Sequence, residues 1–164
     1  MNEYFRFFGA ALILLAAIII CRGYAGYTAR ALDEYDGFCS LLLHMRGKIS
    51  CFLLPPSDIF ADFECECLEK IGFLGELRYG ISMSEAFASA SPKLAINKES
   101  KRMLEGFFDA FGTEYREGEL RRVEQALSEM KNYKEKAEAE LPKSLKLTQT
   151  LISAAALGLV IFLI

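Results

Sequence analysis

The sequence predicts an all-α protein in which a helical domain lies between an N-terminal and a C-terminal transmembrane helix. Three observations support this fold class. Each end of the 164-residue chain carries an apolar run, the residues between the runs show helical periodicity, and no segment alternates polar and apolar residues as a strand would. We place a transmembrane helix at residues 4–27, a cytoplasmic helical domain at 28–143 and a second transmembrane helix at 147–164. The first and last helices should be long and antiparallel.

The N-terminal apolar run covers residues 7–21, about 22 Å of helix, and extending it to Tyr27 gives about 30 Å, the thickness of a bilayer core. Arg22 lies near the end of this stretch, where its long side chain can reach the lipid headgroups. A cleaved signal peptide is the alternative, because Ala29-Arg30-Ala31 has the small-x-small pattern of a cleavage site. The chain would then be a released extracytoplasmic helical binding module, cut near Ala31.

The C-terminal run, residues 147–164, is about 27 Å long as a helix, which is enough to cross a bilayer. From Leu151 onward Ser153 is its only polar side chain. Ala154 and Gly158 are four residues apart and form a small-residue face that allows another helix to approach closely. Ordinary tolerance of small residues in membrane helices explains the same pattern.

Two spans leave both termini on one side of a membrane and the middle domain on the other. The basic residues that flank the spans on the middle-domain side are Arg22, Arg30, Lys134, Lys136, Lys143 and Lys146, whereas the terminal side has Arg6 and the amino terminus. Positive residues are enriched on the cytoplasmic side of membrane proteins. The middle domain is therefore expected to face the cytoplasm.

Two amphipathic stretches of the middle domain should form long helices. The first has apolar residues at steps of three and four: Leu32, Tyr35, Cys39, Leu42, Met45, Ile49 and Phe52. The second is Leu120, Val123, Leu127, Met130, Lys134, Ala137 and Leu141, a seam with 3-4 spacing. We expect the seam to pack on the first stripe within one chain, although packing on another copy in a homo-oligomer is also compatible. Pro142 predicts a kink or short break before the second span.

Shorter helices are expected between these two. Pro55-Pro56 predicts a turn, followed by a helix that opens at Pro56 or Ser57 and runs through Leu68. Ser82 with Glu85 is a capping-box pattern, and Asn97 is a candidate N-cap for the helix that ends before Gly112.

No convergent set of catalytic residues is recognisable, so the sequence predicts neither an enzyme nor a cofactor. The net charge is −3, and the lysines and arginines are dispersed among acidic residues, so the sequence predicts no continuous basic surface for nucleic acid. A hypothesis of a different class is a thiol or metal protein that uses Cys51, Cys65, Cys67 and the only histidine, His44.

In outline the chain resembles the stage III sporulation protein AB family of endospore-forming bacteria. Residues 42–60, with Leu54-Pro55, are similar to the family's first helix and turn, and Phe111-Gly112 followed by residues 119–127 resembles its turn and long helix. Residues 77–87 resemble a pattern also found in the F-type platform proteins of type II secretion. Tyr115 and Glu119 stand where the resemblance leads us to expect an aspartate and a glutamine.

The resemblance implies a platform subunit of the channel complex between mother cell and forespore, in the cell membrane on the mother-cell side of the forespore outer membrane. It also implies a cytoplasmic ATPase, stage III sporulation protein AA, as partner, together with other membrane subunits and lipid. Two groups are candidates for the ATPase contact: Arg78 and Tyr79, and the basic cluster Arg116, Arg121 and Arg122.

Overall fold

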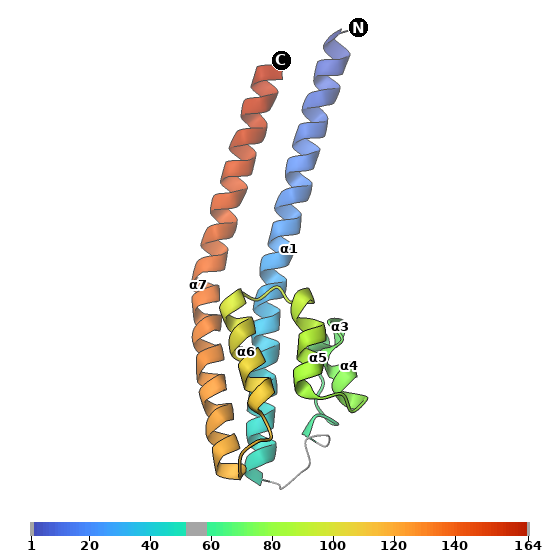
Figure 1. The fold of residues 1–164 in the computed structure, drawn as a ribbon. Coiled ribbons are helices and arrows are strands. Elements are labelled where there is room, and N and C mark those ends of the chain that lie inside the picture. The colour runs from blue at the N-terminus through green and yellow to red at the C-terminus, as the bar shows by residue number, and fades with distance from the viewer. Residues whose placement is uncertain (1, 52–58, 164) are drawn as a thin grey trace. The chain divides into compact units, whose positions relative to one another are not determined.

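The computed structural model of the chain describes residues 2–51 and 59–163 (Figure 1). Its elements are α1 (Asn2–Cys51), α3 (Glu66–Lys70), α4 (Phe73–Arg78), α5 (Met83–Ala90), the 3-10 turn η1 (Ser91–Lys93), α6 (Lys98–Ala110) and α7 (Arg116–Leu163). No strand occurs in the described ranges, and the first and last helices are by far the longest. The predicted all-α fold class is confirmed.

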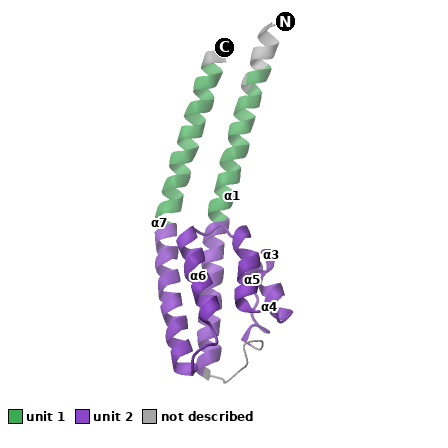
Figure 2. Cartoon of the chain, viewed as in Figure 1, with its two compact units in different colours: residues 1–29, 138–164 green, residues 30–137 purple. Residues whose placement is uncertain are grey.

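The chain divides into two compact units, and α1 and α7 contribute to both (Figure 2). We call Met1–Ala29 with Glu138–Ile164 the terminal unit, and Arg30–Ala137 the middle unit. The expected continuation of the first apolar helix into an amphipathic helix is confirmed, because α1 runs without interruption through both segments.

In the terminal unit, the outer parts of α1 and α7 expose large apolar side chains along their length, such as Leu15, Ile19, Leu151 and Ile161. Both helices are long and apolar enough to cross a membrane, and only 6% of the relevant window in each is buried inside the protein. A soluble domain would bury such residues in its core. The two helices contact each other where the Tyr24 hydroxyl lies 2.9 Å from Ser144 Oγ.

In the middle unit, α7 packs on α1 along the predicted seam. Val123, Leu127 and Met130 join the same buried core as the stripe residues Tyr35, Leu42, Met45 and Ile49. Two cross-helix ion pairs flank this contact. Lys134 Nζ lies 2.5 Å from Asp36, and Arg46 Nε lies 2.9 Å from Glu124. The intramolecular packing expected from the seam is therefore what the structure contains.

Four phenylalanines form the centre of the middle unit. Phe38 comes from α1, Phe73 from α4, Phe87 from α5 and Phe108 from α6, and all four are almost fully buried. Neighbouring ring centroids are 5.2 to 6.2 Å apart in tilted or edge-to-face arrangements, which is the geometry that aromatic pairs prefer. The cluster ties the three short helices to α1.

A buried carboxylate makes a second connection to α1. Glu34 is 1% exposed, and its Oε2 accepts hydrogen bonds from the backbone N–H groups of Ala95 (2.5 Å) and Ile96 (3.2 Å). Its Oε1 accepts from Arg30 Nε one helical turn away at 2.9 Å. The carboxylate thus supplies acceptors to two backbone donors of this segment, and a buried donor that loses its acceptor is costly.

Both predicted N-caps are confirmed. Ser82 Oγ accepts from the N–H of Glu85, and Asn97 Oδ1 accepts from the N–H of Ser100 at 2.7 Å, so each side chain satisfies a free donor at a helix start. Tyr35 reinforces the second cap, because its hydroxyl lies 3.1 Å from Ser100 Oγ and accepts from the N–H of Asn97. The start of α6 is thus fixed to α1.

Gly37 allows α3 to approach α1 closely. A Cβ at this position would lie 2.5 Å from Cys67 Sγ and 3.1 Å from Cys65 Sγ. Both distances are tighter than ordinary van der Waals contact. The missing side chain therefore sets the spacing between the two elements.

One expectation about helix boundaries is wrong, and another is tested only in part. Of the kink or short break expected at Pro142, the break does not occur, because α7 continues through the proline, while the kink remains a prediction. The helix expected to run through Leu68 is interrupted, since residues 60–65 are turn and extended chain and α3 begins only at Glu66. There Phe60 and Phe63 turn into the core. The predicted turn at Pro55-Pro56 lies outside the described residues.

Replacing Glu34 by alanine should destabilise the middle unit, because the buried N–H groups of Ala95 and Ile96 would lose the carboxylate that accepts from them. We expect the free energy of unfolding to fall by about 2 to 4 kcal/mol. Urea denaturation of the full chain in detergent, followed by circular dichroism, measures this. Asp33→Ala is the matched control, since Asp33 is the exposed acidic neighbour on the same helix. Equal losses in the two variants would contradict the role given to Glu34.

Candidate functional site

The basic cluster at the start of α7 is largely occupied by contacts within the chain. Arg116 Nε donates to the carbonyl oxygen of Ile49 at 2.9 Å, and its Nη2 donates to that of Ser50. These carbonyls belong to the last turn of α1, where the helix leaves acceptors unpaired and favours a positive charge. Arg116 therefore caps α1.

Arg122 holds the turn between α6 and α7. Its Nη1 donates to the carbonyl of Ala110 at 2.6 Å and to Glu119 at 2.9 Å, and its Nη2 pairs with Glu114. The side chain is only 22% exposed. A guanidinium with this many partners connects the end of α6 to the first turns of α7.

Glu119 supports the same turn from the other side. Its Oε1 accepts from the N–H groups of Gly112 (3.0 Å) and Glu114 (2.9 Å), while its buried Oε2 has no hydrogen-bond partner among the described residues. Gly112 has φ +85°, the left-handed conformation that glycine adopts without strain. A glutamine, which the family resemblance led us to expect here, could accept the same two hydrogen bonds through its amide oxygen.

Arg121 remains available at the surface of α7. Its one hydrogen bond among the described residues is a 3.4 Å contact to the Glu117 carbonyl of its own helix. Tyr115, the residue before α7, is 96% exposed. Of the predicted basic cluster, Arg121 is the member best placed to meet a partner.

The turn after α4 holds the other predicted pair. Arg78 Nη2 donates to the carbonyl of Phe63 and to Glu69, both at 2.9 Å, so this arginine fixes the chain before α3. Tyr79 is 89% exposed, and Gly80 follows with φ +81°. The left-handed glycine turns the chain sharply and leaves the tyrosine on the surface.

A groove of about 370 Å³ adjoins this turn, and we call it the turn groove. Its lining residues come from three segments of the chain: Phe60; Leu77, Gly80, Ile81, Ser82, Met83 and Ser84; and Phe108, Asp109 and Phe111. The floor is apolar. Ser84 donates a hydrogen bond to Asp109 and so bridges the second and third of these segments.

Both predicted clusters border the carboxyl end of α6. Asp109 and Phe111 line the turn groove, while the Ala110 carbonyl between them accepts from Arg122. No hydrogen bond or ion pair in the described part of the chain joins Arg78 or Tyr79 directly to the basic cluster. The sequence analysis missed Asp109 and the three phenylalanines of the groove, Phe60, Phe108 and Phe111, because only the tertiary fold brings them to residues 80–84.

The thiol and histidine residues do not converge on one centre. Cys65 Sγ and Cys67 Sγ are 3.2 Å apart and share a hydrogen bond but no disulfide, and Cys67 donates to the carbonyl of Asp33. His44 Nε2 instead bonds the carbonyl of Ile59 at 2.8 Å. No group of three or more potential ligands able to hold a metal ion is found within the described ranges, and the side chain of Cys51 lies outside them.

The small-residue face of the second span is not used within the terminal unit. Ala154 and Gly158 are exposed, and a Cβ added to Gly158 would meet nothing within 4 Å. The alanine that α7 buries here is Ala156, at 5% exposure. Packing of another helix on Ala154 and Gly158 remains a prediction.

The candidate cleavage site lies inside α1. Ala29-Arg30-Ala31 is helical throughout, Ala31 is 2% exposed, and Arg30 pairs with the buried Glu34. Cleavage near Ala31 remains a prediction that nothing in the structure tests.

Comparison with known proteins gives one match. The family model described as stage III sporulation protein AB covers residues 6–164, nearly the whole chain. The chain belongs to this family. No curated protein and no solved structure matches it. The family is a sporulation protein family and not a known enzyme family, and membership agrees with the two helices long and apolar enough to span a membrane.

Cys67 should react slowly with alkylating reagents, because burial of its thiol, reinforced by Cys65, raises the pKa of Cys67 to about 12. The thiolate is the reactive form, so its share at pH 8 is about a thousandfold lower than for an ordinary thiol. The labelling rate should continue to rise about tenfold per pH unit beyond pH 9, where an ordinary thiol levels off. Iodoacetamide labelling with tandem mass spectrometry of the Cys65/Cys67 peptide tests this. An unchanged rate after unfolding in urea would refute the shift.

Proposed function

We propose that this family member is a non-enzymatic membrane subunit of a sporulation channel or secretion-like complex, which docks a cytoplasmic ATPase on its middle unit. By the family resemblance the ATPase is stage III sporulation protein AA. The observation that carries the docking role is the turn groove with the exposed Tyr79 beside it. In this proposal both apolar helices cross the cell membrane and the middle unit lies in the cytoplasm.

The membrane arrangement is supported by composition at both ends. The exposed apolar lengths of α1 and α7 bury little within the protein, and a bilayer would cover them. Basic residues concentrate next to the spans on the middle-unit side, including Lys143 and Lys146. The positive-inside tendency assigns that side to the cytoplasm, where an ATPase is available.

The docking surface is supported by its chemistry. Tyr79 and Ile81 expose apolar area on a turn that Gly80 holds, and the groove beside them has a floor of aromatic and aliphatic side chains. Exposed aromatic residues next to apolar depressions are the usual anchors of protein interfaces. The rim offers Asp109 and Ser84, which could orient a partner through polar contacts. Arg121 adds a positive charge suited to an acidic patch on the ATPase.

A catalytic role has no support in the same groove. Among the described residues that line it, the one carboxylate, Asp109, accepts a hydrogen bond from Ser84. Its other lining side chains are apolar or serine, and they supply no acid and base pair.

Replacing Tyr79 by alanine should weaken ATPase binding by about tenfold or more, because it removes the most exposed anchor beside the turn groove. Tyr115→Ala is the matched control. It removes the same side chain from a comparably exposed position beside α7. The full-length protein in nanodiscs, titrated with purified ATPase and read by biolayer interferometry, gives both dissociation constants, and the control should change by less than twofold.

The reverse pattern, with loss of binding only in Tyr115→Ala, would move the docking surface to the start of α7. Arg121→Glu then tests that surface without breaking the contacts of Arg116 and Arg122, which hold the fold. Unchanged binding in all three variants would remove both surfaces from consideration.

The topology predicts where reporters will work. A phosphatase fused after Ile164 should be active, because that enzyme folds only outside the cytoplasm, whereas a fluorescent protein inserted in the middle unit should fluoresce in the cytosol. Alkaline carbonate should leave the chain in the membrane fraction. A middle-unit tag that is reachable only from outside the cytosol would refute the proposed orientation and favour the released module.

A further inference from the structure

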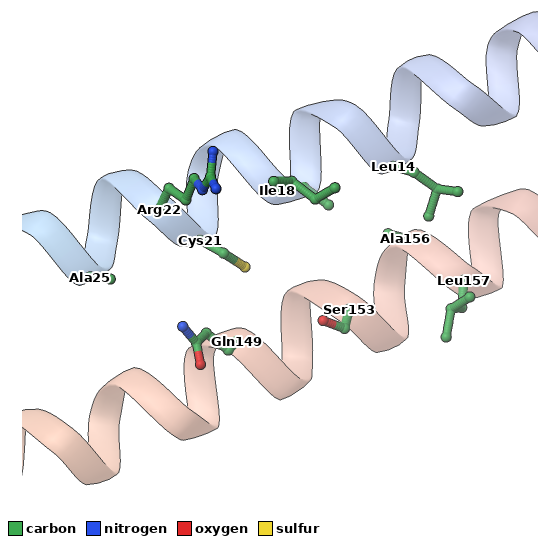
Figure 3. Close-up of a pocket in the computed structure, with 10 residues that line it drawn as sticks. Leu14, Ile18, Cys21, Arg22, Ala25, Gln149, Ser153, Ala156 and Leu157 are labelled. Carbon is green, nitrogen blue, oxygen red and sulfur yellow. The ribbon is translucent and has the colours of Figure 1, made fainter.

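A second groove lies between the two apolar helices of the terminal unit. It has a volume of about 580 Å³ and is lined by residues of both α1 and α7 (Figure 3). Because both sides belong to one compact unit, the groove is a feature of that unit itself. Nothing in the proposed docking role uses it.

The chemistry of this groove changes along its length. One end is apolar, with Leu14, Ile18 and Leu157 on its walls, while the other end carries Arg22 and Gln149. In Figure 3 the side chain of Cys21 points toward α7 with Gln149 opposite it, whereas the side chain of Arg22 is drawn on the side of α1 that faces away from α7, so Arg22 borders the groove rather than crossing it. The groove is therefore an apolar trough with a cationic, hydrogen-bonding end.

Arg22 lacks an anion in the described part of the chain. It is exposed, no carboxylate lines the groove, and no hydrogen bond or ion pair to it is found among the described residues. A guanidinium offers five donors arranged to grip phosphate or carboxylate oxygens. Near the end of a membrane helix, an arginine reaches the interface, where an anionic headgroup is a favourable partner.

The position of Arg22 relative to the apolar runs of the two helices indicates which anion lies close to it. It directly follows the apolar run 7–21 of α1, and Gln149 lies two residues before the apolar run that starts at Leu151 on α7. Both helices thus change from apolar to polar at the same level. The Tyr24–Ser144 contact lies just beyond it, near Lys143. Hydrocarbon gives way to phospholipid headgroups at such a boundary.

We propose that this groove binds one anionic phospholipid of the cytoplasmic leaflet, with its phosphate on Arg22 at the edge of the groove and an acyl chain along Ile18, Leu14 and Leu157. The inference rests on the membrane crossing in the proposed function, but not on ATPase docking. A lipid is the occupant that matches both ends of the groove at once, since it joins an anionic group to a long apolar chain. A partner helix would match only by carrying an acidic residue at this one level.

The test compares two lipids that differ only in headgroup charge. The full chain in uncharged detergent is titrated with phosphatidylglycerol or phosphatidylcholine of identical acyl chains, and bound lipid is counted by native mass spectrometry. We expect phosphatidylglycerol to bind more tightly. Arg22→Gln should weaken its binding by about fivefold, and Arg22→Lys should keep most of the affinity. Ala17→Phe, which fills the trough, should weaken both lipids.

Lys143→Gln is the matched control, because it removes one exposed positive charge from the same end of the unit without lining the groove. Its effect on phosphatidylglycerol binding should be negligible. Equal weakening by Lys143→Gln and Arg22→Gln would indicate general attraction to the surface and overturn the site. Equal binding of the two lipids, or a bound second copy in place of lipid, would overturn it as well.

Carbonate extraction of the same variants separates this inference from the proposed function. A chain that stays in the membrane but shows no headgroup preference refutes the lipid site alone. Release by carbonate would refute the membrane crossing and the lipid site together. Loss of ATPase binding with intact phosphatidylglycerol preference would leave the lipid site standing.

Discussion

The middle unit depends on a carboxylate that the chain buries in its first helix. Glu34 satisfies two backbone donors of the 94–96 segment, and the neighbouring Tyr35 engages the N-cap of α6. Together these contacts fix where α6 begins. The position of α6 then determines where Phe107 and Phe108 enter the core and where Asp109 and Phe111 reach the turn groove. A single polar anchor on α1 therefore orients both the hydrophobic core and the candidate docking surface.

Arginines that suggest an interaction surface in the sequence can instead be engaged in contacts that hold the fold together. Arg116 and Arg122 lie in the segment that the sequence offers as a basic interface, yet their guanidinium groups close the ends of α1 and α6. Arg22 is different, because the terminal unit offers it no described anion. Charge alone does not separate a structural arginine from one that recognises a ligand; the supply of acceptors around it does.

Local patterns were sufficient to predict much of this fold. The apolar runs, the α1 stripe, the α7 seam and the caps at Ser82 and Asn97 each depend on residues close in sequence. The roles of Glu34 and Glu119 could not be predicted. The donors to Glu34 lie in a segment distant in sequence, and the donors to Glu119 are placed by the conformation of the turn at Gly112, which the sequence pattern does not give. Only one part of the turn groove could be predicted. The sequence pointed to residues 77–87, but the α6 residues reach the groove only when the core has folded.

The close approach at Gly37 has a consequence for how the family varies. Because the two sulfur atoms of Cys65 and Cys67 occupy the space that a side chain at position 37 would need, these three positions form one packing unit. We expect them to covary among family members, with larger residues at position 37 only where positions 65 and 67 are smaller. On this view Cys65 and Cys67 are present because their side chains fit the space beside Gly37, and not because they take part in redox chemistry.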